Sequence, residues 1–253
     1  NRNLDVSQKY QKKSHLQHIK ERPDTYIGSC EARTDYMWVM DDDRMVQREV
    51  SYVPGFLKIF DEILVNAADN KRRDSSMKSI RVTINHDRIS VENDGQGIPI
   101  VMHETEKMWV PQMVFGELLS GDNYDDDDER VVGGRNGYGA KLANIFSTTF
   151  CVETIDSKAG QRYTQTWRNN MSTVEKPSLT SSGKRKDFTR ITFAPDLAKF
   201  KQDHIDADTQ ALFRKRVYDI AGTTPSDVRV YLNGVRLPVQ NFKQYCGLYF
   251  EDE

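Results

Sequence analysis

Cysteine is scarce in this sequence: Cys30, Cys151 and Cys246 are its only cysteines in 253 residues. The number is odd, the three positions lie far apart, and none belongs to a Cys-x-x-Cys pair. This pattern argues against a disulfide framework and against a cysteine zinc site. We interpret the cysteines as idle or buried thiols in a reducing compartment. The five histidines show no ligand spacing with a carboxylate partner, so we expect no metal site built on them.

Long apolar runs and an excess of one charge are also absent. No stretch of about 18 apolar residues occurs, which predicts that the chain has no membrane span, and we expect no membrane among its partners. The first residues, Asn1 to Leu4, lack Met and an apolar signal region, so we expect a piece excised from a longer chain. The formal net charge of -2 does not favour nucleic-acid binding by the bulk surface, although it leaves a local basic groove open. The length of 253 residues allows one large or two small domains, and 37% apolar with 29% charged residues is typical of a globular chain.

The pattern of apolar residues predicts a chain that mixes helices with hairpin-connected strands. It lacks the regular strand–helix alternation of a doubly wound fold, so we expect an α+β protein with largely antiparallel strands. The expected elements are helices over 8–21, 56–73, 110–119, 140–146 and 206–221, hairpins over 36–53, 79–93 and around 233–234, strands over 148–155, 161–168 and 188–194, and loops over 94–99, 121–130 and 169–187.

The helix expected over 56–73 has one polar and one apolar face. Helical spacing places Glu62, Asn66 and Asp69 together. Such a face is also typical of any solvated surface helix, and that alternative stays open at this step. A carboxylate one turn from an amide suits a phosphate site, because an amide oxygen is a ligand that magnesium accepts. Glu62 is then a candidate base that deprotonates a water attacking a phosphate. The opposite face carries Phe56, Phe60, Ile63 and Ala67, which we expect to face the core.

Two glycine-containing segments follow. Asp94-Gly95-Gln96-Gly97 lies at a strand end, where Asp94 is a candidate acceptor for an exocyclic amine such as that of adenine, although an ordinary turn has the same pattern. The segment from Gly133 to Lys141 has four glycines within seven residues and leads into a helix, an arrangement that suits phosphate oxygens. It fits neither a P-loop nor the dinucleotide fingerprint.

These elements, in this order, resemble the GHKL ATPase superfamily. The runs Glu-Ile-Leu-Val-Asn-Ala-Ala-Asp-Asn at 62–70 and Gly-Gly-Arg-Asn-Gly-Tyr-Gly-Ala-Lys at 133–141 are similar to eukaryotic-type DNA topoisomerase II, a type IIA family. Further similar runs are Arg-Pro-Asp-Thr-Tyr-Ile-Gly at 22–28, Asn-Tyr-Asp-Asp-Asp at 123–127, Asn-Ile-Phe-Ser at 144–147 and Val-Tyr-Asp-Ile at 217–220. The resemblance covers nearly the whole chain.

The resemblance implies a role for each matching residue. It implies Glu62 as general base, Asn66 as magnesium ligand, Asn70 as a nearby polar residue, and Asp94 as the adenine-recognising residue beside Gly97 and Ile98. It implies that Thr189 supports the adenine contact through water. Gly121, Asp122 and Asn123 match a segment near the ribose and phosphates, although other members often have Ser-Ser-Asn there. Gly134, Arg135, Asn136, Gly137, Tyr138, Gly139, Ala140 and Lys141 match the phosphate loop. Tyr10 matches a strap tyrosine that reaches the partner subunit's nucleotide.

The resemblance also implies a fold and a function. The implied fold is the GHKL (Bergerat) two-layer sandwich, with a mostly antiparallel sheet and helices on one face. Residues 1–20 match an N-terminal strap and residues 21–253 the ATP-binding domain. ATP with Mg²⁺ would close a homodimer that captures DNA, in the nucleus or in an organelle. A lysine that a following domain supplies from a Gln-Thr-Lys loop has no match here, so we expect weak turnover by this chain alone. A dimerisation module with negligible turnover and a protein kinase of the same superfamily are the alternatives.

Overall fold

The structure is a computed structural model that describes residues 13–118, 138–183 and 185–250. Within these ranges a nine-stranded sheet has the strand order β11-β10-β3-β4-β9-β5-β6-β7, and β8 also pairs with β6. The β10–β3 pair is parallel and the other pairs are antiparallel. The strands are β3 (Ser79–Ile84), β4 (Ile89–Asp94), β5 (Ser147–Asp156), β6 (Gln161–Arg168), β7 (Thr173–Val174), β8 (Ser178–Ser181), β9 (Phe188–Pro195), β10 (Arg229–Leu232) and β11 (Val235–Arg236).

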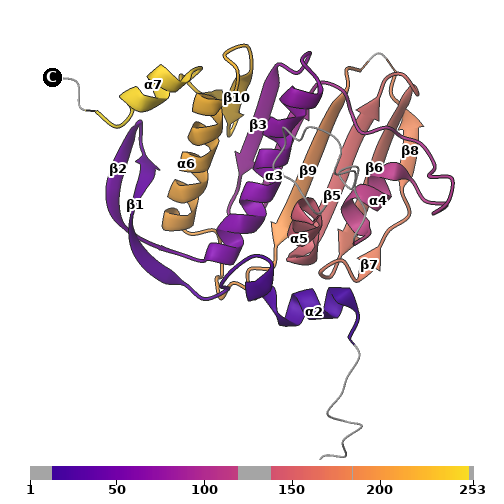
Figure 1. The fold of residues 1–253 in the computed structure, drawn as a ribbon, viewed down its shortest axis with the longest axis horizontal. Coiled ribbons are helices and arrows are strands. Elements are labelled where there is room, and N and C mark those ends of the chain that lie inside the picture. The colour runs from indigo at the N-terminus through magenta and orange to yellow at the C-terminus, as the bar shows by residue number, and fades with distance from the viewer. Residues whose placement is uncertain (1–12, 119–137, 184, 251–253) are drawn as a thin grey trace, which may run out of the picture.

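Helices cover one face of this sheet (Figure 1). They are α3 (Pro54–Arg73), α4 (Val110–Gly116), α5 (Gly139–Ile145) and α6 (Ala207–Thr223). Aromatic rings join two of them, because Phe60 of α3 stacks on Phe213 of α6 with ring centroids 4.2 Å apart. This arrangement confirms the predicted α+β fold with helices on one face of a mostly antiparallel sheet.

The other face of the sheet is charged, which explains why no apolar face needs covering there. Arg81, Glu92, Arg190 and Glu153 stand opposite one another on β3, β4, β9 and β5. Ion pairs of alternating sign connect them across the four strands. Opposite charges directly across strands stabilise such a sheet.

α3 is the helix that carries the candidate base, and local sequence determines both its ends. Pro54 occupies the first helical position, where the missing N–H costs nothing. Lys71, Arg72 and Arg73 lie in the last turn, where positive charge suits the helix dipole. The predicted apolar residues Phe56, Phe60, Ile63 and Ala67 are all buried, as expected.

Smaller elements lie around this body. The hairpin of β1 (Arg33–Asp41) and β2 (Arg44–Tyr52) forms its own two-stranded sheet and packs against α6. α2 (His15–Glu21), η1 (Pro23–Thr25) and α7 (Phe242–Gly247) complete the described chain. The α2 helix buries Ile19 completely and begins with a capping box between Ser14 and Gln17.

Several elements differ from the sequence predictions, and the helix expected over 110–119 ends at Gly116. The expected loop over 169–187 contains β7 and β8, two short strands that pair with β6. Their sequences lack the apolar alternation from which a strand is predicted. The described part of the expected helix over 8–21 begins at His15. The sequence did not predict α7, a six-residue helix whose Tyr245 hydroxyl donates to Asp219 of α6.

Among the helices of the described residues, none combines the length and the apolar character that a membrane crossing requires.

Candidate functional site

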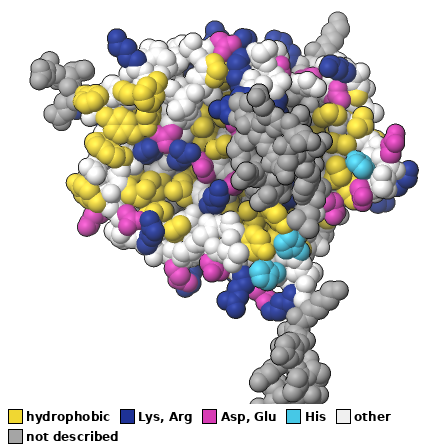
Figure 2. All heavy atoms as spheres, viewed as in Figure 1, with side chains coloured by type: hydrophobic (Ala, Val, Ile, Leu, Met, Phe, Trp, Pro, Cys, Tyr) yellow, Lys and Arg dark blue, Asp and Glu magenta, His cyan; other side chains and the backbone are white. Residues whose placement is uncertain are grey.

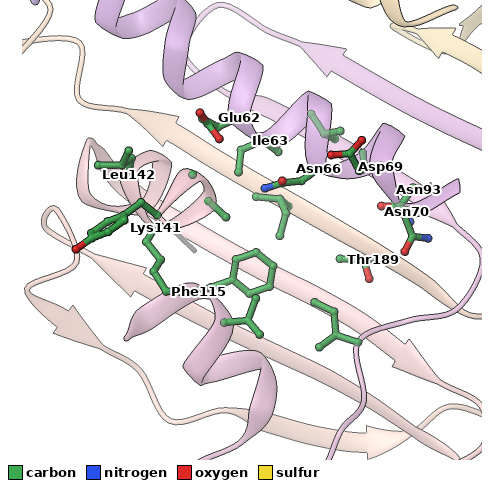
Figure 3. A pocket seen from close by; sticks show the side chains of 18 of the residues that line it. Glu62, Ile63, Asn66, Asp69, Asn70, Asn93, Phe115, Lys141, Leu142 and Thr189 are labelled. Atoms are coloured by element: carbon green, nitrogen blue, oxygen red, sulfur yellow. The ribbon is translucent and has the colours of Figure 1, made fainter. Parts of the chain in front are cut away.

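A cavity of about 1140 Å³ lies between α3, the helices α4 and α5, and the sheet (Figure 3). Its wall combines residues from segments that are far apart in the sequence. They include Glu62, Asn66, Asp69 and Asn70 of α3, Asn93 of β4, Gly97 and Ile98 of the following loop, Phe115 of α4, Gly139, Ala140 and Lys141 of α5, and Thr189 of β9. The polar face of α3 therefore faces this cavity rather than bulk solvent.

Glu62 is held from two sides. Lys58, one turn earlier on α3, forms an ion pair with its Oε1 atom. Its other oxygen, Oε2, lies against Gly139, where an added Cβ atom would be only 2.0 Å away. The glycine thus permits the close approach of the carboxylate to the beginning of α5.

The end of the glycine-rich segment reaches the same cavity. Tyr138 is the N-cap residue of α5, and Gly139, Ala140 and Lys141 follow in its first turn. All four line the cavity, and Lys141 is 1% exposed. A buried lysine that lines the same cavity as a carboxylate and an amide is suited to a strongly anionic ligand. The predicted positions Gly121, Asp122, Asn123, Gly134, Arg135, Asn136, Gly137 and Tyr10 lie outside the described residues.

Asp94 does not line the cavity, in contrast to the ligand-facing position expected from the sequence. Its Oδ1 atom accepts hydrogen bonds from the backbone N–H groups of Lys78, at 2.8 Å, and of Ser79, at 2.7 Å. It does not line the cavity, whereas Asn93 does and is 6% exposed. Strand alternation is the reason, because β4 buries Ile89, Val91 and Asn93 on the helix side of the sheet. Asn93, rather than Asp94, is the polar residue of β4 that lines the cavity.

The Asn93 amide has one end free for a ligand. Its Nδ2 atom donates to the backbone oxygen of Asp94 at 3.0 Å. No donor to Oδ1 is found among the residues that the structure describes. Asn70 donates to the same Asp94 oxygen at 3.5 Å, which ties α3 to β4 at this end of the cavity.

Thr154 of β5, which no sequence motif identified, organises this end. Its hydroxyl donates to the backbone oxygen of Phe188 at 3.0 Å and accepts from the backbone N–H of Ile98 at 3.0 Å. It also lies 3.1 Å from the Thr189 hydroxyl. Because the Thr154 proton is used on Phe188, Thr189 must be the donor in that pair. The Thr189 oxygen then offers its lone pairs to the cavity. The signal that could have marked Thr154 is its alternation with Phe150 and Val152, which places it on the buried face of β5.

At Gly97, the loop after β4 packs against β5 without room for a side chain. A Cβ atom at Gly97 would lie 1.9 Å from the backbone oxygen of Ile155. Gly95 has a positive φ of 90°. Gln96 N–H donates to the Asp74 carboxylate at 2.6 Å, and this hydrogen bond, with those from Ser76, holds the pKa of Asp74 below its ordinary value.

His15 and Tyr26 form the edge of the cavity near Tyr138, and the sequence analysis did not place them there. The Tyr138 hydroxyl lies 3.2 Å from Nε2 of His15, and the two rings meet edge to face with centroids 5.5 Å apart. The Tyr26 hydroxyl lies 2.9 Å from Nδ1 of His18. Because His15 belongs to α2 and Tyr26 follows η1, the N-terminal segment contacts the end of the glycine-rich segment.

No group of three His, Cys, Asp or Glu side chains that could hold a metal is found within the described ranges.

Comparison with known proteins now assigns this fold and cavity to a class. Residues 53–197 match the family described as histidine kinase-, DNA gyrase B-, and HSP90-like ATPase. This match covers more than half of the chain and includes α3, the Gly95–Gly97 loop and α5. The chain belongs to this family of ATPases.

Within that family, eukaryotic DNA topoisomerases are strongly similar to the chain. It is 54% identical over 250 residues to DNA topoisomerase 2 of Candida glabrata and 54% identical over 253 residues to human DNA topoisomerase 2-alpha. These alignments cover 97% and 99% of this chain but only 18% and 16% of the two relatives. The ATPase region of Saccharomyces cerevisiae topoisomerase II superposes with a TM-score of 0.95 and 53% identity, over 97% of this chain and 66% of that one. The similarity predicted from the motifs is confirmed.

Proposed function

We propose that the cavity binds ATP and that Glu62 is the base for hydrolysis of its γ-phosphate. The observation that carries this proposal is the contact between the Glu62 carboxylate and Gly139, at the beginning of the helix that completes the glycine-rich segment. It puts a base where the last phosphate of a nucleotide would lie. Membership of an ATPase family supports the same assignment.

The two ends of the cavity suit the two ends of ATP. At one end, Asn93 and Thr189 offer acceptor oxygens, while Ile98 and Ile191 supply apolar surface for a flat base. An exocyclic amine that donates to Asn93 would identify adenine. Towards the other end, Lys141 lines the same cavity as Glu62 and Asn66 and supplies positive charge. We therefore infer that adenine lies near β4 and β9 and the phosphates near α5.

Asn66 fits a magnesium ion that accompanies the phosphates. Its amide lines the cavity and is exposed to it, one turn after Glu62. Mg²⁺ takes one or two protein oxygens together with phosphate oxygens and waters, so a single amide here is a sufficient protein contribution. When bound, the ion would neutralise charge on the phosphates. The work of Glu62 is to orient a water and accept its proton.

The positions outside the described residues extend this proposal. Gly134, Arg135, Asn136 and Gly137 would surround the phosphates, and Asn123 with its neighbours would approach the ribose. Tyr10, in the proposed strap over residues 1–20, would reach the nucleotide of a second copy. The relative order of these segments in the chain supports these assignments.

At the level of a longer protein, we propose that this chain is the ATP-operated gate of a DNA topoisomerase II. ATP-driven closure of a homodimer would capture a DNA segment, and hydrolysis would reopen the gate. The names of its relatives and its 53% identity to a topoisomerase II ATPase region support this proposal. The nucleus is the proposed location, because the named relatives are eukaryotic enzymes that would act on DNA there.

Direct measurement on the purified chain tests the proposal. We expect Mg-ATP to bind in calorimetry and to be hydrolysed slowly, and Glu62→Gln to abolish hydrolysis while binding persists. Loss of a general base typically lowers the rate by about 10²–10⁴-fold. Glu31→Gln, which removes a carboxylate paired with Lys201 on the surface, is the control. Absence of ATP binding would contradict the proposal. Binding with dimerisation but no Glu62-dependent hydrolysis would favour the dimerisation module.

A further inference from the structure

We propose that Lys58 is a positioning residue that holds the Glu62 carboxylate in the orientation required for hydrolysis. This inference rests on the proposed role of Glu62. Lys58 and Glu62 both line the cavity, and the Lys58 ammonium pairs with one of the two carboxylate oxygens.

The pair leaves the second oxygen in a defined place. With Oε1 engaged by Lys58, Oε2 lies against Gly139 at the beginning of α5. A glutamate side chain otherwise rotates about several bonds, and ordering such a side chain costs roughly 1–2 kcal/mol of free energy. The lysine therefore selects the rotamer in which the second oxygen faces the proposed phosphate end.

The same pair contributes little to the stability of α3. Lys58 precedes Glu62 by four residues, which is the less favourable order for an ion pair on a helix. The lysine side chain is 47% exposed, and exposed pairs of this kind contribute about 0–1 kcal/mol to folding. A change at Lys58 should consequently leave the fold intact and alter only what Glu62 does.

The positive charge of Lys58 gives it a second role beside Glu62. A bound triphosphate would put several negative charges beside Glu62, and these would repel its carboxylate away from the phosphate end. An ammonium group on the opposite side of the carboxylate offsets that repulsion. Asp69 and Asp74 are the other acidic residues that line the cavity, and Lys58, Arg73 and Lys141 are its basic ones. Of these, Lys58 is the one that forms an ion pair with Glu62 among the described residues.

A direct contact between Lys58 and the phosphates would be a different role, and it would change different kinetic and binding constants. Removal of a phosphate ligand weakens ATP binding, whereas removal of a positioning residue lowers the rate of the chemical step and leaves binding unchanged. Single-turnover hydrolysis, with the chain in excess over labelled Mg-ATP, separates the two and also detects slow turnover. Calorimetric titration with Mg-ATP gives the affinity.

The test compares Lys58→Gln, Lys58→Arg, Glu62→Gln and the double variant Lys58→Gln/Glu62→Gln. Misplacement of a catalytic group by about 1 Å costs roughly 10²-fold in rate, so we expect Lys58→Gln to hydrolyse ATP about 10- to 100-fold more slowly with an unchanged dissociation constant. Lys58→Arg should recover most of the rate, and the double variant should be no slower than Glu62→Gln alone. Lys215→Gln is the matched control, since Lys215 pairs with Asp219 in the same order on α6, outside the cavity.

Several results would overturn the inference. A normal rate for Lys58→Gln, or a weaker affinity for ATP at a normal rate, would remove Lys58 from the positioning of Glu62. So would a crystal structure of Lys58→Gln in which the Glu62 carboxylate still lies against Gly139. If the unmodified chain binds ATP and Glu62→Gln hydrolyses it equally well, the proposed base is wrong and the inference falls with it.

Discussion

Glu62 and Gly139 are in contact across the cavity. No additional carbon atom fits between the carboxylate and the glycine. A Cβ atom on Gly139 would lie 2.0 Å from Oε2 of Glu62 and 2.9 Å from its carboxyl carbon. One residue belongs to the middle of α3 and the other begins α5. Their contact joins the candidate base to the glycine-rich segment, and it makes the hydrolytic role of Glu62 sensitive to a single methyl group.

The first prediction concerns Gly139→Ala. Gly139 lacks a positive φ and lies in a helix, so its backbone accepts alanine without strain. The methyl group would displace the flexible end of Glu62, and we expect ATP hydrolysis to fall while thermal unfolding stays near that of the unmodified chain. Gly247→Ala is the control, because a Cβ atom there meets nothing within 4 Å. Normal hydrolysis by Gly139→Ala would show that the contact does not matter for catalysis.

The second prediction separates Asn93 from Asp94. Asn93→Ala should weaken ATP binding by about 2- to 10-fold, the value of one hydrogen bond of about 0.5–1.5 kcal/mol. Asp94→Ala should instead destabilise the fold by about 1 kcal/mol, because it removes the acceptor of the Lys78 and Ser79 N–H groups. Calorimetry and urea unfolding of both variants measure the two effects. If Asp94→Ala weakened ATP binding and Asn93→Ala only destabilised the fold, Asp94 would be the residue that contacts the ligand.

The third prediction concerns Gly97→Ala. Its Cβ atom would lie 1.9 Å from the backbone oxygen of Ile155 and 2.8 Å from Oγ1 of Thr154, and a backbone atom cannot move aside as a side-chain end can. Forced overpacking of this kind costs typically about 1–3 kcal/mol, and we expect a loss of that size in the free energy of unfolding. ATP affinity should also fall, since the loop would leave β5. A variant as stable as Gly247→Ala would contradict the packing seen here.

The fourth prediction is a pH dependence of stability. Hydrogen bonds from Gln96 N–H and from Ser76 lower the pKa of Asp74 in the folded chain. A lowered folded pKa means that the contribution of Asp74 is present above the unfolded value of about 3.9 and is lost as pH falls through the lower folded value. Between pH 5 and pH 2, the unmodified chain should therefore lose more stability than Asp74→Asn. Parallel acid-unfolding curves for the two proteins would exclude this role.

Local patterns were sufficient to predict most of the fold. The apolar spacing of α3 and the hairpin of β3 and β4 follow from which side chains avoid water, and both agree with the structure. β7 and β8 were missed because strands this short take their conformation from pairing with β6 rather than from their own sequence. The error at Asp94 was of another kind: the alternation of Ile89, Val91 and Asn93 was visible in the sequence and already placed Asn93 on the buried face.

The sequence by itself determined the chemistry that is available to this protein. Helical spacing put Glu62 and Asn66 on one face, and the motifs identified the ATPase family, because these depend only on neighbours along the chain. Only the tertiary structure decided which groups meet: Glu62 with Gly139, Thr154 with Thr189, and Asn93 instead of Asp94 with the cavity. Such contacts join segments that are far apart in the sequence, and they exist only once α3, α5 and the sheet have packed together around one core.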